Sequence, residues 1–203
     1  PGINLALDRL TLIGDAVRVT SNHGWTASLD TLRFATRQVE PDGTRHEIGL
    51  EMLGLEPDPR VTAALPDFPE KLEKLRLDAT VTLTAPLDRR AGRSSPRVSQ
   101  IDVTDVRLVW GTLVLSGSGS IATSADGLAE GRILLRLTNW RKAMPLAVAA
   151  GLVKPEVVPT WVNMFALLAA QTGNPEDLDL PLVFANGRMS LGPLPLGPAP
   201  RMN

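Results

Sequence analysis

Trp110-Gly111-Thr112-Leu113-Val114-Leu115-Ser116-Gly117 is the stretch that decides the fold, and residues 186–192 repeat its pattern as Asn-Gly-Arg-Met-Ser-Leu-Gly. In both copies a turn glycine is followed by alternating positions that place Leu or Met on one side. Residues 12–19 have the same shape, with one extra residue after Gly14. A strand, a glycine turn and a second strand form a β-hairpin. The recurrence predicts a chain of meandering antiparallel strands.

Upstream of this stretch the chain also alternates apolar and polar residues. Residues 3–37 predict three or four strands, with turns at Gly14-Asp15 and at Ser21-Asn22-His23-Gly24. A strong Pro41-Asp42-Gly43 turn predicts two long paired strands over 32–40 and 44–53.

Four prolines make residues 57–69 a loop with at most one short helical turn. Residues 72–87 then predict one strand. Residues 98–137 predict three strands, with turns at Trp110-Gly111 and at Ala125-Asp126-Gly127.

After residue 137 the hydrophobic period changes to that of helices. One helix is expected near Trp140–Leu152 and a second over Pro155–Gln171, ending at Gly173-Asn174-Pro175. The second helix is apolar on most sides, so it is expected to be buried against a sheet, because Phe165–Ala170 is far too short to span a membrane. A closing hairpin over 178–191 and an extended, polyproline-like tail over 192–200 complete the chain.

These elements predict a mainly β (α+β) fold. It is a curved antiparallel meander in one domain over residues 1–203, with the two helices near 140–171 packed on its concave face. The polar loop over 88–97 is the place where the sheet would divide into two.

The composition excludes several classes of function. There is no cysteine, so thiol nucleophiles, zinc–thiolate sites and disulfides are ruled out. A net charge of −1 argues against nucleic-acid binding. Aromatic residues make up only 4% and Tyr is absent, which disfavours platforms that stack sugars or bases.

The residues that could take part in catalysis or ligand binding are better explained by structural roles. His23 and His46 each lie next to a turn and are expected to be solvated, outside any metal-ligand spacing. The Ser-Gly-Ser-Gly-Ser run at 116–120 lacks the helix that a phosphate loop needs, so close approach of a neighbouring strand or a bulge explains it better. The carboxylates form no evident acid–base pair. The arginines at 89, 90, 93 and 97 are expected to form a solvated loop, which could also contact an anionic membrane surface. We therefore expect no enzyme, no cofactor and no metal.

Four tryptophans remain, and core packing is the default for each. Trp140 and Trp161 flank the apolar helical segment, so they are also candidates for lining a hydrophobic groove. The candidate groove residues are Trp140, Trp161, Met164, Phe165 and Leu168.

Three segments carry a family resemblance: Gly24-Trp25, Asn139-Trp140-Arg141 and the closing Asn186-Gly187-Arg188-Met189-Ser190-Leu191-Gly192-Pro193-Leu194-Pro195-Leu196-Gly197. With them the whole chain resembles a bacterial family of uncharacterised proteins, domain-of-unknown-function family 2125. The resemblance implies an envelope protein with an N-terminal signal peptide or anchor, in agreement with a sequence that begins Pro-Gly-Ile. The strand–glycine–strand pattern is also similar to AsmA-like envelope proteins, whose curved sheets hold lipid.

The resulting expectation is a non-enzymatic protein of the periplasm. It would be either free or anchored in the membrane, facing the periplasm, through an N-terminal segment that is missing from this sequence. Its apolar groove would bind lipid or another hydrophobic ligand. The alternative is a structural or assembly protein whose helices fill the groove and which binds a protein partner of the envelope.

Overall fold

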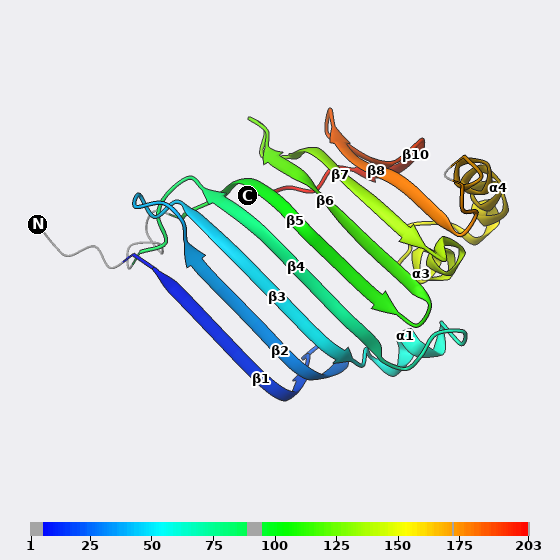
Figure 1. The fold of residues 1–203 in the computed structure, drawn as a ribbon, viewed down its shortest axis with the longest axis horizontal. Coiled ribbons are helices and arrows are strands. Elements are labelled where there is room, and N and C mark those ends of the chain that lie inside the picture. The colour runs from blue at the N-terminus through cyan, green and yellow to red at the C-terminus, as the bar shows by residue number, and fades with distance from the viewer. Residues whose placement is uncertain (1–5, 89–94, 172, 203) are drawn as a thin grey trace, which may run out of the picture.

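The computed structural model describes residues 6–88, 95–171 and 173–202. All ten strands form one antiparallel sheet in which the spatial order follows the order in the chain (Figure 1). The fold is thus mainly β with a curved open sheet, as the sequence predicts. The strands are β1 (Arg9–Thr20), β2 (Thr26–Gln38), β3 (Arg45–Leu55), β4 (Leu72–Leu83), β5 (Val98–Trp110), β6 (Leu113–Thr123), β7 (Ala129–Thr138), β8 (Asp177–Ala185), β9 (Arg188–Leu191) and β10 (Leu194–Pro198).

Both copies of the repeated pattern form tight hairpins. Trp110 pairs with Leu113 across a turn in which Gly111 has φ of 58°. Ala185 pairs with Arg188 across Asn186-Gly187, whose φ angles of 52° and 72° are those that a two-residue hairpin turn requires. The predicted 41–43 and 125–127 turns also join neighbouring strands.

The predicted turn at Gly14-Asp15 is wrong. β1 continues through it, and its pairing with β2 keeps one register from Arg9↔Arg37 to Thr20↔Thr26. The glycine serves a different purpose there, because a Cβ at residue 14 would lie 2.7 Å from Cγ2 of Val17. The left-handed residue in this strand is Ala16, with φ of 52°.

The predicted polyproline tail is also wrong, because residues 194–198 form the edge strand β10 against β9. Proline is tolerated on an edge strand, where it need not donate to a neighbour. Beyond β10 the chain returns to the start of β7: the Ala129 N–H donates to the Pro200 carbonyl and the Met202 N–H to the Gly127 carbonyl, both at 2.9 Å. The sheet therefore curls at this end.

Both predicted helices are present between β7 and β8. A 3-10 turn η1 (Trp140–Lys142) leads into α3 (Ala143–Ala149), and a second turn η2 (Pro155–Val157) leads into α4 (Val158–Ala169). They lie at the C-terminal end of the sheet (Figure 1) and contact β6 and β8. The short helix α1 (Pro59–Ala63) is the single turn expected in the proline-rich loop.

The registers define two faces of the sheet, because residues directly opposite one another in neighbouring strands share a face. One continuous row on the first face is entirely apolar: Leu32, Met52, Leu75, Leu108, Leu115, Leu137 and Leu178. We call this side the apolar face. The helices and the returning tail pack on it, so it is the concave side of the curl, as expected.

The opposite side, called the polar face, carries ion pairs between neighbouring strands. Arg33 forms an ion pair with Glu51. Arg136 forms a bidentate ion pair with Asp179, with hydrogen bonds of 2.8 and 2.7 Å. These hydrogen bonds hold the pKa of Asp179 below its usual range. The polar face is thus solvated through its charged groups.

The sheet bends where β5, β6 and β7 meet. In β5 the pairing with β6 shifts between Val103 and Val106, which marks a bulge. In β6 a Cβ at Gly119 would lie 2.2 Å from the Arg132 carbonyl oxygen, and one at Gly117 would lie 2.8 Å from that of Leu134. The Ser-Gly-Ser-Gly-Ser run is therefore explained by close approach of β7, as the sequence analysis favours.

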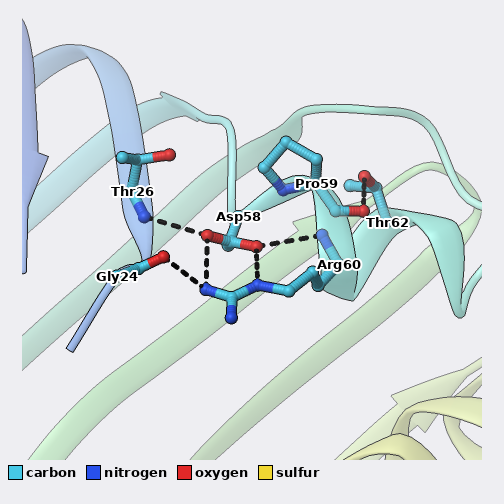
Figure 2. A network of polar contacts seen from close by, with 6 residues as sticks. All are labelled: Gly24, Thr26, Asp58, Pro59, Arg60 and Thr62. Carbon is cyan, nitrogen blue, oxygen red and sulfur yellow. Dashed lines mark hydrogen bonds and ion pairs between the residues drawn. The ribbon is translucent and has the colours of Figure 1, made fainter.

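At the other end, an ionic network holds the β1–β2 turn against α1 (Figure 2). The Asp58 carboxylate accepts hydrogen bonds from the Thr26 N–H at 2.9 Å and from the Arg60 side chain at 2.7 and 3.1 Å. Arg60 also donates to the Gly24 carbonyl at 2.7 Å. The bonds from Arg60 and Thr26 keep the pKa of Asp58 well below its usual range.

The 88–97 segment does not divide the sheet, because β4 and β5 on either side of it pair directly. The expected solvated loop itself falls mostly outside the described residues, as do Arg89, Arg90 and Arg93.

Candidate functional site

An apolar cavity lies between the sheet and the helical insertion. Its volume is about 300 Å³. Its floor consists of leucines from β5 to β10 that point to the apolar face: Leu108, Leu113, Leu115, Leu135, Leu137, Leu178, Leu180, Leu191 and Leu196. Leu196 belongs to β10, so the curl of the last strand helps to enclose the space.

The roof of the cavity comes from the helical insertion. It is formed by Trp140, Ala143, Met144, Leu146, Ala147, Ala150, Leu152, Val153, Trp161 and Phe165. Among the described residues that line the cavity, no side chain carries a charge, a hydroxyl or an amide. A water molecule needs two or more polar partners to be held in such a space, and apolar cavities of this kind stay dry or take apolar guests.

Aromatic contacts fix the roof. Phe165 is 1% exposed and meets the fully buried Trp140 edge-to-face, with ring centroids 5.7 Å apart and planes at 86°. Trp161 meets Phe165 at 6.1 Å and 72°. The Trp140 N–H donates to the Pro175 carbonyl at 3.0 Å, so this polar group is satisfied outside the cavity.

The Asn139-Trp140-Arg141 segment anchors the insertion at both ends. Asn139 adopts a left-handed conformation with φ of 56°, which turns the chain out of β7, and its side chain donates to the Thr112 carbonyl at 2.7 Å. The Arg141 guanidinium lies 4.5 Å from the centre of the Trp140 ring and pairs with Glu176 at 3.0 Å. The start of the insertion is thereby tied to its end, next to β8.

Of the five predicted groove residues, Trp140, Trp161 and Phe165 line the cavity. Met164 and Leu168 are half-buried and pack against the same cluster without belonging to the lining. The leucines of the floor and the residues of α3 are not among the predicted groove residues. The floor had a signal, because Leu113 and Leu115 are the alternating positions of the repeated hairpin itself.

The apolar face continues beyond the cavity, over β1 to β5. Leu12, Phe34, Leu50, Leu77 and Val106 form one cross-strand row there. All are half-buried or exposed, and the main helix contacts in the described structure are to β6 and β8. Leu108 joins the two regions, since it lines the cavity and lies on the same face of β5 as Val106, two residues away, while its partner Leu75 packs against the cluster of Leu65, Leu72 and Trp110. The cavity and this open apolar surface are therefore parts of one face.

The histidines differ from each other. His23 is exposed in its turn, as expected, but the expectation for His46 is wrong: this side chain is 2% exposed. Its Nε2 lies 3.2 Å from the Gly43 carbonyl oxygen, and it lies on the apolar face of β3, opposite Val81 of β4.

The carboxylates lie apart from the cavity. Asp102 accepts hydrogen bonds from Ser120 and Gln100, both at 2.7 Å, and these lower its pKa. Within residues 6–88, 95–171 and 173–202 no group of three or more His, Asp or Glu side chains is placed to hold a metal ion. None of the helices in that part of the chain is long and apolar enough to cross a membrane.

The fold and the cavity define a class of protein: an antiparallel β meander that carries an apolar cavity beneath an inserted helical pair. Comparison with known families matches residues 1–200 to the one described as "Uncharacterized protein conserved in bacteria (DUF2125)". The chain belongs to this family, which confirms the resemblance seen in the sequence. No curated protein and no solved structure matches it.

Proposed function

We propose that this protein is a non-enzymatic component of the bacterial envelope that binds a lipid or a similar hydrophobic ligand in the cavity under its helices. In this proposal it works in the periplasm, free or held at the membrane. The single observation that carries the proposal is a lining made only of apolar side chains.

The size of the cavity supports a ligand. Ligand pockets typically enclose about 300–1,000 Å³, and the space here, about 300 Å³, lies at the lower end of that range. It is large enough for part of an acyl chain. A polar headgroup would find no partner inside and would stay at the surface.

The open apolar surface offers a path for the acyl chain of a ligand that is longer than the cavity. From Leu108 the cavity floor continues to Val106, two residues away on the same face of β5, and from there to Leu77 on β4. A ligand longer than the cavity would rest on these side chains and exclude water from them, which is favourable in proportion to the apolar area covered.

The experiment compares two variants of α3. Ala147 lines the cavity and Ala149, two residues further on, is exposed and does not. Ala147→Phe fills part of the space, whereas Ala149→Phe adds the same side chain outside it. We expect a fluorescent fatty acid to bind wild type and Ala149→Phe with equal affinity, and Ala147→Phe at least about tenfold more weakly, because the added ring competes for the same space.

Native mass spectrometry of protein purified from bacterial envelopes is the companion measurement. Added mass that a lipid extract accounts for supports the proposal. A spectrum of the protein without added mass, together with no binding of the fatty acid to wild type, would overturn it. That result would favour a structural role in which the helices only pack against the sheet and complete its core.

A further inference from the structure

The outer edge of β1 is open from Arg9 onward in the described structure; just before it, the Leu7 N–H donates to the Leu87 carbonyl at 2.7 Å. Among the strands of the described residues, β1 is the first in the sheet and pairs with β2 alone. The Gln38 N–H donates to the Asp8 carbonyl at 2.7 Å, so even-numbered residues here direct their backbone groups at β2. Residues 9, 11, 13 and 15 consequently direct theirs outward.

This edge is also apolar. Leu10, Leu12 and Ile13 are 46%, 51% and 66% exposed. An exposed, regular edge strand with apolar side chains is a template for pairing with another chain, unless charges or prolines protect it. The regular part ends at Ala16, whose φ of 52° interrupts the extended backbone.

We propose that a second copy of this chain pairs with this edge, β1 against β1, antiparallel about a two-fold axis at Leu12. Arg9 then lies opposite Asp15 of the partner subunit, and Thr11 opposite Ile13 of the partner subunit. Leu12 lies opposite its own counterpart. All the outward N–H and C=O groups of residues 9–15 meet partners in this register.

Charge complementarity selects this register over its neighbours. Arg9 and Asp15 are both exposed; the Arg9 side chain donates to Asp8 at 3.4 Å, and Asp15 accepts a hydrogen bond from Thr31 at 3.4 Å. The two-fold symmetry forms the Arg9–Asp15 pair twice, on the polar face. A shift by two residues in either direction loses both pairs, and a shift by one turns each copy's apolar side chains to the wrong face.

The dimer joins two sheets with their apolar faces on the same side. Leu10 and Leu12 of each copy become covered at the junction, so the open apolar surface becomes continuous across both molecules. The contact is a single strand pair, so we expect an equilibrium between monomer and dimer that depends on concentration.

A single cysteine tests the register, because the chain has none of its own. Leu12→Cys places two thiols opposite each other in a non-hydrogen-bonded pair, where Cα atoms lie about 4.5 Å apart and a disulfide can form. Leu10→Cys is the matched control, on the same face and of similar exposure, with its thiols separated by about four residues along the strands, roughly 13 Å. We expect oxidation to cross-link Leu12→Cys and not Leu10→Cys.

Charge reversal tests the pairing without cysteine. Arg9→Asp or Asp15→Arg alone places like charges opposite each other, and we expect sedimentation to report dimerisation weakened about tenfold or more. The double variant Arg9→Asp/Asp15→Arg restores the pairs and the dimer. Wild type that stays monomeric at every concentration, equal cross-linking of the two cysteine variants, or a double variant no better than the single ones would each overturn the proposal.

Discussion

The two halves of this sheet have the same strand pattern and different surroundings. Over β1 to β5 the described structure covers the apolar face at one end, where Leu65 of the loop before β4 is buried with Leu72 and Trp110. Over β6 to β10 the inserted helices and the returning tail cover it. Trp140, Phe165 and Ala169 are almost completely buried in the second half, and Phe34 and Leu50 are half-buried in the first. Alternation alone therefore makes a sheet, and a closed core arises only where other elements of the chain are added to it.

The largest expected difference in the free energy of unfolding is between one Phe→Ala substitution in the covered half and one in the open half. Phe165→Ala removes a ring from the closed core and should lower the free energy of unfolding by about 3–5 kcal/mol. Phe34→Ala removes the same ring from the open surface and should cost only about 1 kcal/mol, because that side chain keeps contact with water. Urea unfolding curves of the two variants give both values.

Equal losses at the two positions would contradict this comparison. If Phe34→Ala cost as much as Phe165→Ala, something would already cover the open surface in solution. Repeating the curves over a range of protein concentrations distinguishes cover by a second copy, since only that cover depends on concentration.

A smaller effect is expected at the bend between the halves. A Cβ at Gly119 would meet backbone atoms of β7 at 2.2 and 2.7 Å, so Gly119→Ala should force β6 and β7 apart and destabilise by about 2–3 kcal/mol. Gly49→Ala in β3 is the control, where the nearest atom would be 3.7 Å away. It should be neutral or stabilising by about 0.5–1 kcal/mol, since alanine restricts the unfolded chain. Thermal unfolding followed by circular dichroism would measure both, and similar changes at the two glycines would show that the bend does not depend on close packing there.

Much of this architecture is predictable from the sequence because strand alternation and turn residues act locally. The hairpins at Gly111 and Gly187 and the change to helical periodicity at Trp140 follow from neighbouring residues alone. Gly14 was misread because its absent side chain makes room for Val17, which is a matter of packing. The strand β10 was missed because prolines disfavour a central strand and nothing local indicates an edge.

The candidate site was predictable in part, for a related reason. The roof residues Trp140, Trp161 and Phe165 belong to the one apolar helical stretch. The floor is assembled by pairing of six strands, and only the register reveals that Leu108, Leu137 and Leu178 share a row. Burial of His46 likewise depends on its place on the apolar face of β3, which only the register reveals.

The central claim is that the covered half of the apolar face, and not the open half, holds the ligand. Nuclear Overhauser contacts between an unlabelled fatty acid and protein with labelled leucine methyl groups test it most directly. The account predicts contacts from the acyl chain to Leu135, Leu137 and Leu180 on the cavity floor. Contacts confined to Leu12, Leu50 and Leu77 on the open surface, or no contacts at saturating ligand, would contradict it.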